Sequence, residues 1–159
     1  PYLMHHKVFI VDGQTVIFTG QGEGTRAIRI EAQAGAFVVK DVWTTDKVGT
    51  GYNTPVLKEG MLFGLSDRGY IFCMDAKTGQ TAWTDTTKRE TFGAMVDAGP
   101  VLFCLLSNSE LIIFKPDSKQ YAEIARYKVA DTPTYAHPVL SGTRVFVKDA
   151  DSLALWTIP

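Results

Sequence analysis

The stretch from Gly60 to Trp83, GMLFGLSDRGYIFCMDAKTGQTAW, decides the fold of this chain. Two apolar runs and a shorter third run alternate in it with polar turns that contain Asp and Gly. Short strands separated by such turns are typical of an antiparallel β-meander. The strands predicted here are Met61–Ser66, Tyr70–Met74 and Gln80–Thr84.

A glycine followed by an apolar run and a polar turn occurs four times along the 159 residues. The anchor glycines stand 39 to 47 residues apart, at Gly13, Gly60, Gly99 and Gly142. A period near 40 residues, with four short strands per unit, is typical of β-propeller blades. The sequence therefore predicts an all-β fold, a partial β-propeller of about three and a half four-stranded antiparallel blades. This single domain covers residues 1–159, with blades at 1–53, 54–94 and 95–136 and an incomplete last blade at 137–159.

The last unit ends after its third predicted strand, Ser152–Ile158. In closed propellers the last blade is often completed by a strand from the beginning of the chain, which removes the open edges. Three and a half blades cannot close a ring, and the sequence begins at Pro1 without an initiator Met. We therefore expect a C-terminal fragment whose remaining blades lie upstream.

Composition narrows the range of partners. The net charge is −1, from 16 basic and 17 acidic residues, and this balance gives no electrostatic case for binding nucleic acid. No apolar run approaches the ~18 residues of a membrane span. Cys73 and Cys104 each lie in an apolar run, which favours buried free thiols over a disulfide.

The turn at Asp75-Ala-Lys-Thr78-Gly79, followed by Trp83, resembles the repeat of the pyrroloquinoline-quinone-type (PQQ-like) propeller family. Asp75 can accept main-chain N–H groups within the turn, Gly79 supplies a positive φ, and Trp83 can pack on the neighbouring blade. In this structural blade motif, Trp43 is the expected counterpart of Trp83 in the first blade. Tyr127 is the expected counterpart in the third blade.

The resemblance implies one of two functions. The first is a non-catalytic propeller similar to BamB, which acts as a scaffold for protein interactions or ligand binding, is exported from the cytoplasm to the periplasm, and needs no cofactor. The alternative is the C-terminal part of a quinoprotein dehydrogenase, which holds PQQ and a calcium ion and oxidises alcohols or sugars. The vicinal Cys-Cys pair common in such enzymes is absent from the sequence. We favour the scaffold, assign no catalytic residue and leave the enzymatic alternative open.

The loops between blades are the expected contact region, because they should share one face with the turns between second and third strands. They carry the candidate rim residues Tyr52, Asn53, Phe92, Tyr135 and His137. The three aromatic residues could equally plug the channel and pack adjacent blades together. His137, directly before Pro138, is more typical of a hydrogen-bonded structural residue than of a metal ligand. Two carboxylates in the turn at 149–152 are ordinary turn chemistry, so we predict no metal site.

Overall fold

The computed structural model describes residues 7–10 and 13–158, and the regular secondary structure in that part consists of β-strands alone. Fifteen strands form four separate antiparallel sheets in the described residues. No helix in this part is long and apolar enough to cross a membrane. The prediction of an all-β partial propeller is confirmed.

Each sheet is one blade, with strands in sequence order. The first blade contains β1 (Lys7–Ile10), β2 (Thr15–Gly20), β3 (Gly24–Gln33) and β4 (Ala36–Thr45). The second contains β5 (Val56–Lys58), β6 (Met61–Leu65), β7 (Ile71–Asp75) and β8 (Thr81–Thr84). The third contains β9 (Gly93–Asp97), β10 (Leu102–Leu106), β11 (Glu110–Phe114) and β12 (Glu123–Lys128). The fourth contains β13 (Val139–Ser141), β14 (Arg144–Lys148) and β15 (Leu153–Thr157).

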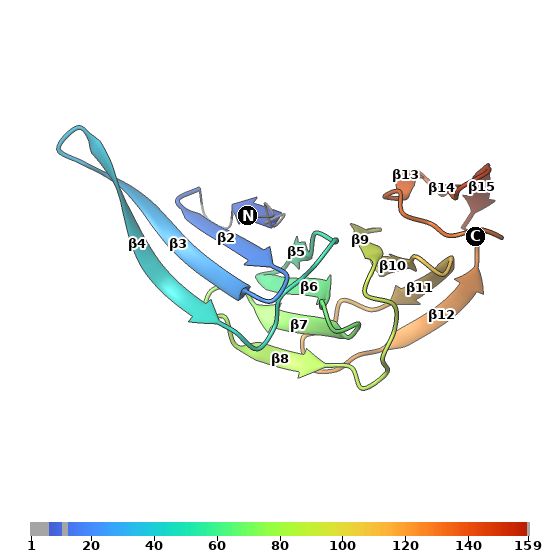
Figure 1. Cartoon of the computed structure of the whole chain (residues 1–159), viewed down its shortest axis with the longest axis horizontal. Coiled ribbons are helices and arrows are strands. Elements are labelled where there is room, and N and C mark those ends of the chain that lie inside the picture. The colour runs from blue at the N-terminus through green and yellow to red at the C-terminus, as the bar shows by residue number, and fades with distance from the viewer. Residues whose placement is uncertain (1–6, 11–12, 159) are drawn as a thin grey trace.

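The four sheets lie side by side along an arc (Figure 1). Strands β1, β5, β9 and β13 line its inner side, and β4, β8 and β12 lie on its outer side. Burial follows this order, because the middle strands are covered by a neighbouring blade. All five residues of β10 are buried, whereas β8 and β12 are mostly exposed. Middle strands covered on both faces read in the sequence as continuous apolar runs.

Side chains of the middle strands form the cores between blades. Phe63 of the second blade and Phe114 of the third belong to the same buried cluster. Cys73 and Cys104 also lie in this cluster as free thiols, which confirms that prediction. Burial raises the pKa of each thiol to about 12, so both stay protonated at neutral pH.

Three details differ from, or extend, the predicted pattern. The third blade begins with β9 at Gly93, two residues before the predicted boundary at 95. Strands β3 and β4 have ten residues each. Beyond Thr15, the first residue of β2, they pair only with each other and form an exposed two-stranded arm (Figure 1). The apolar run Val8–Val11 predicts an inner strand for the first blade, and its last residue, Val11, lies outside the described residues.

Candidate functional site

The loops between blades are fastened to the turns between second and third strands, so both lie on one face. The Asp67 N–H donates to Gly49 O over 2.9 Å, and the Ser107 N–H donates to Phe92 O over 3.0 Å. The Thr134 N–H donates to Ser107 O over 3.1 Å. Main-chain bonds of this kind fix each loop to its neighbouring blade, and we call this side of the arc the loop face.

Three aromatic rings from three successive inter-blade loops meet on the loop face. Tyr52 and Phe92 stack with ring centroids 3.8 Å apart and an interplanar angle of 11°. Tyr135 packs edge-on against Phe92, with centroids 5.6 Å apart and an angle of 87°. Tyr52 remains 47% exposed and Tyr135 remains 72% exposed. The structure therefore brings these three predicted rim residues together, and we name them the aromatic array.

The other two rim candidates do not join the array through any ring contact among the described residues. Asn53 is buried, donates from Nδ2 to Leu65 O over 2.7 Å, and accepts the Leu65 N–H at Oδ1 over 3.3 Å. The Thr134 hydroxyl donates to Leu106 O of the third blade over 2.6 Å. Asn53 thus binds the main chain at the last residue of β6, and Thr134 binds the main chain at the last residue of β10. His137 is exposed, and its Nδ1 lies 3.2 Å from Pro138 O.

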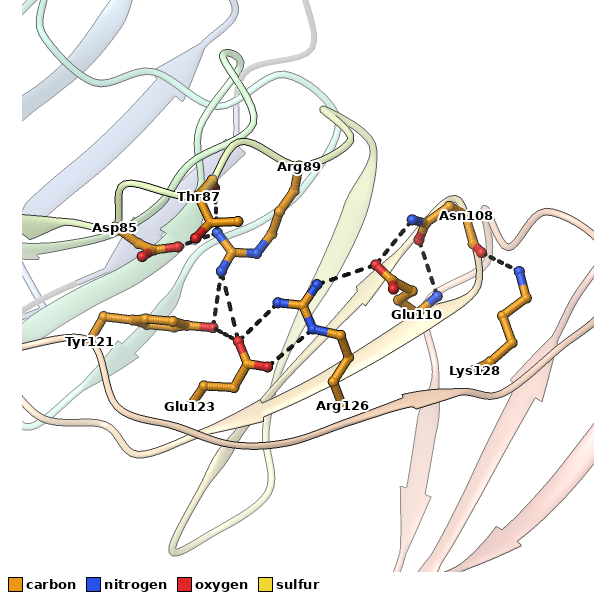
Figure 2. A network of polar contacts seen from close by, with 9 residues as sticks. All are labelled: Asp85, Thr87, Arg89, Asn108, Glu110, Tyr121, Glu123, Arg126 and Lys128. Atoms are coloured by element: carbon orange, nitrogen blue, oxygen red, sulfur yellow. Dashed lines mark hydrogen bonds and ion pairs between the residues drawn. The ribbon is translucent and has the colours of Figure 1, made fainter.

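A polar network lies between the second and third blades (Figure 2). Its centre is Arg89, whose side chain is only 2% exposed and forms an ion pair with Asp85. Arg89 also donates to Thr87 O over 2.7 Å and to the Tyr121 hydroxyl over 3.2 Å. The remaining members lie on β12, in the turn between β10 and β11, and at the start of β11: Asn108, Glu110, Glu123, Arg126 and Lys128.

The contacts in this network shift the pKa values of Glu123 and Tyr121 in opposite directions. Hydrogen bonds from Arg126 and Tyr121 hold the pKa of Glu123 below its usual value, in spite of its partial burial. Burial, together with the hydrogen bond to Glu123, raises the pKa of Tyr121. The ionised form of Glu123 therefore stabilises the fold at neutral pH, and this contribution is lost as the pH falls through the lowered pKa.

No motif in the sequence indicates this network. Arg89 lies in a polar linker, where a charged residue ordinarily points into water, and its burial depends on Tyr121 and Glu123 of the next blade. The only local signal is the carboxylate of Asp85 four residues earlier.

The turn at 75–79 has the predicted local geometry. Asp75 Oδ1 accepts the N–H groups of Lys77 and Thr78 over 2.9 and 2.7 Å and the Thr78 hydroxyl over 2.9 Å. Gly79 has φ +73°. Asp149 makes the same kind of turn with Asp151 and Ser152, and these hydrogen bonds hold its pKa well below the usual range.

Two tryptophans join successive blades on the outer side of the arc. The Trp43 indole packs on the second blade, and its Nε1–H donates to Ala76 O over 3.2 Å. The Trp83 indole lies against Phe63 and Tyr121, and its Nε1–H donates to Asp117 O in the third blade over 2.8 Å. The outer strands β4 and β8 therefore each carry an indole that donates a hydrogen bond to a carbonyl of the next blade.

The position of these tryptophans is set by a β-bulge that recurs in each complete blade. Trp43 pairs with Ala27 and Trp83 pairs with Cys73, each directly after the register shift. In the third blade the residue at this place is Ala125, which pairs with Ile113. Tyr127, the expected counterpart, lies two residues farther along β12 and is 55% exposed. Tyr127 was predicted because it is the aromatic residue of this strand, but the connection between β11 and β12, residues 115–122, is longer than that between β7 and β8, residues 76–80, and the position after the bulge falls on Ala125.

Gly79→Ala is expected to destabilise the chain by about 2 to 4 kcal/mol, from the left-handed backbone and from overpacking together. A Cβ at Gly79 would overlap with Trp43 Cε3. Gly60→Ala is the matched control, because Gly60 has φ +79° and a Cβ there would meet nothing within 4 Å. Urea unfolding followed by circular dichroism measures both variants. Equal losses in the two would show that the contact with Trp43 contributes nothing.

The outer sides of these blades, joined through tryptophans and Asp-x-x-Thr-type turns, define a β-propeller of PQQ-like repeats. The family model described as "Outer membrane protein assembly factor BamB" matches residues 5–85 and 40–158. The chain therefore belongs to this family. Among curated proteins, no match to the chain was found.

Solved structures show the same fold. BamB from Moraxella catarrhalis superposes with a TM-score of 0.71 at 14% identity, over 94% of this chain and 45% of that one. The computationally designed Ika4 protein gives a TM-score of 0.69 at 9% identity, over 100% of this chain and 94% of that one. The designed Ika8 protein gives 0.52 at 9% identity, over 96% and 58%. The chain thus spans less than half the length of the BamB structure that it matches.

Proposed function

We propose that this chain is part of a non-catalytic, BamB-like propeller that binds other proteins through its loop face. The observation that supports this most directly is the aromatic array of Tyr52, Phe92 and Tyr135. Tyrosine and phenylalanine are enriched in the cores of protein interfaces, because they bury a large area with few rotatable bonds. An exposed aromatic cluster is therefore a suitable contact point for a polypeptide.

The loops that carry the array are held in place before any partner arrives. Their main chains are bonded to the turns of neighbouring blades, and Asn53 and Thr134 fix the adjacent strand ends. A surface that is already ordered loses little conformational entropy on binding, which favours affinity. The same rigidity suits a scaffold that positions one protein relative to another.

The description of the family as an outer membrane protein assembly factor supports a more specific proposal. We propose that the partner is a protein involved in assembling outer membrane proteins, and that the chain works in the periplasm or elsewhere outside the cytoplasm. Nucleic acid is excluded from this proposal because the net charge of −1 offers no basic surface of the required strength.

The residues described here do not fit the quinoprotein alternative. Calcium prefers six to eight oxygen ligands, usually with several carboxylates among them. In residues 7–10 and 13–158 there is no group of three or more His, Cys, Asp or Glu side chains that could hold a metal ion. We therefore assign no step of alcohol or sugar oxidation to these residues and propose no cofactor.

Site-specific photo-cross-linking tests the proposed function. A photoreactive phenylalanine derivative at Tyr135 should give defined cross-linked proteins in cells, which mass spectrometry identifies. The same group at Phe37, which is 81% exposed on the arm, serves as the control and should give none of them. Adding Tyr52→Ser should lower the affinity for the identified partner roughly thirtyfold, as expected for an interface hot spot. Identical products at both positions, or none at Tyr135, would contradict the proposal.

A further inference from the structure

The two-stranded arm of the first blade stands clear of the other blades (Figure 1). It consists of residues 30–39, where β3 and β4 pair beyond the start of β2. Strand β4 ends at Thr45, just before the loop that carries Tyr52, so the tip of the arm lies at the opposite end of this strand from the loop face. Among the described residues, no buried cluster includes a side chain of the arm.

One face of the arm is entirely apolar and open to water. Residues directly opposite each other on paired strands share a face, and here Ile30 pairs with Val39 and Ala32 pairs with Phe37. Phe37 is 81% exposed, Val39 is 58% exposed and Ile30 is 37% exposed. Three large apolar side chains are therefore exposed on one side of a hairpin.

The outer end of the arm, residues 32–39, has no charged side chain on either face. Ala36 and Val38 make the second face apolar there as well, opposite Gln33 and Glu31. Gln33 is the only polar side chain of the outer end, and its Nε2 donates back to Glu31 over 3.4 Å. The outer end therefore presents apolar groups on all sides.

Charged side chains of both signs begin directly below the outer end. Arg29 and Glu31 lie on β3, and Lys40 and Asp41 lie on β4. Lys40 Nζ donates to Glu31 Oε2 over 2.6 Å, and the Arg26 guanidinium forms an ion pair with Asp41. The arm thus changes from a balanced band of charge to an uncharged end within one residue along each strand.

The turn at the tip also avoids polar side chains. Gln33 pairs with Ala36, so Ala34 and Gly35 form a two-residue loop, and their φ angles are +49° and +84°. Asn-Gly and Asp-Gly are the usual residues when both φ angles of such a loop are positive. Alanine adopts the left-handed conformation less readily than Asn or Asp. The sequence has an apolar residue where a polar one would form the turn more easily.

These features fit the surface of a phospholipid bilayer better than a protein. A protein that packed on the face of Phe37 would leave Ala36 and Val38 in water, whereas lipid surrounds the end of the arm. From Glu31 to the tip at Ala34 the strand rises about 10 Å. Interfacial segments enter the boundary between headgroups and acyl chains by roughly 5 to 10 Å. Zwitterionic headgroups, which carry both signs of charge, would then meet the charged band.

The open edges of the arm limit this depth. Strand β4 has no neighbour on its outer side among the described residues, so half of its main-chain groups need water or headgroups as partners. Open edges are not tolerated in the hydrocarbon core of a bilayer. An arm of this kind can enter the interface and cannot cross it.

We propose that the outer end of the arm inserts into the surface of a zwitterionic phospholipid bilayer, with Phe37 as its main apolar contact. The inserted part ends at the band of charge formed by Arg29, Glu31, Lys40 and Asp41. The tip and the loop face lie at opposite ends of β4, so an inserted arm turns the aromatic array away from the lipid. The contact goes beyond the proposed function, because it uses none of the array residues.

The test is flotation of the chain with unilamellar vesicles of phosphatidylcholine and phosphatidylethanolamine on a density gradient. Phe37→Ser should lower the partition coefficient about tenfold, because it removes the largest apolar group from the contact. Tyr127→Ser is the matched control. It removes an aromatic side chain that is 55% exposed on β12, outside the arm, and should leave partitioning unchanged.

Ala34→Asn separates membrane binding from folding. Asn tolerates the left-handed conformation, so the urea midpoint should stay the same or rise. Partitioning should fall about threefold or more, because the amide of Asn loses hydration at the tip. Phe37→Trp should add fluorescence that phosphatidylcholine brominated on its acyl chains quenches, whereas the fluorescence added by Tyr127→Trp should not be quenched.

Each other outcome contradicts the proposal. A wild-type chain that does not float, or a folded Phe37→Ser variant that floats as well, would show that the arm does not insert. The same holds if Ala34→Asn partitions unchanged or if Trp at position 37 is not quenched. A wild-type dimer that Phe37→Ser dissociates in analytical ultracentrifugation would identify a second copy as the occupant. If Phe37→Ser does not fold, Val39→Thr gives a second, nearly isosteric comparison.

This experiment is independent of the cross-linking at Tyr135, because Phe37→Ser leaves the array residues unchanged. Failed flotation with successful cross-linking refutes only the membrane contact. Failed cross-linking with successful flotation refutes only the role of the loop face.

Discussion

Methionine in place of Arg89 is expected to lower the free energy of unfolding by about 3 to 5 kcal/mol, the usual cost of breaking a buried ion pair. The side chains of Arg89 and Asp85 are 2% and 10% exposed. Without Arg89, the Asp85 carboxylate would therefore be left buried and unpaired, with little hydration to replace the ion pair. The substitution also removes the guanidinium that lies 5.2 Å from the centre of the Tyr121 ring. The measurement is urea unfolding at pH 7 followed by circular dichroism.

A double substitution separates the ion pair from packing. Arg89→Met with Asp85→Leu removes both charges, and replacing a buried ion pair by apolar groups is often neutral or stabilising. We therefore expect the double variant to regain most of the stability that the single variant loses. An unchanged unfolding midpoint in Arg89→Met alone would show that the network contributes little to joining the second and third blades.

Trp83→Ala is expected to cost about 3 to 5 kcal/mol, the usual range for truncating a large aromatic side chain in a core. The substitution removes the ring from its contacts with Phe63 and Tyr121 and removes the hydrogen bond to Asp117 O. Circular dichroism is the suitable signal, because the substitution also removes a fluorophore.

Trp83→Phe is the graded control. It keeps an aromatic ring in the interface and removes the Nε1–H, so its cost should be nearer ~1 kcal/mol, the net value of a typical hydrogen bond. If Trp83→Ala and Trp83→Phe lost equal stability, the hydrogen bond rather than ring packing would join these blades.

The sequence allowed the architecture to be predicted because blade formation depends on local signals. The turn at Asp75–Gly79 closes through its own main chain and side chains, and alternation of apolar runs with such turns sets the strands. Strand β12 at 123–128 illustrates the value of the repeat, since it takes the same place in the third blade as β4 and β8 do in the first two.

The outer-strand register and the polar network could not be predicted, because both depend on contacts between strands or blades. The register of β12 places Ala125, and not the predicted aromatic residue Tyr127, directly after the bulge. Arg89 is buried only because Tyr121 and Glu123 of the next blade cover it. Of the rim candidates, Tyr52, Phe92 and Tyr135 lie in contact with one another, and their role in binding stays a prediction. The buried position of Asn53 is visible only in three dimensions.

The recurring bulge also bears on solubility. Val42, Ala82 and Ile124 are the extra residues of the three bulges, and each lies in an outer edge strand, β4, β8 or β12, and interrupts its ladder. A bent and interrupted edge strand pairs poorly with a strand of another copy, so these three edges resist edge-to-edge aggregation. Strand β15 pairs with β14 without any register shift from Leu153 to Thr157. Its regular edge is therefore the place where aggregation would start, and the first to protect in any attempt to produce this chain in quantity.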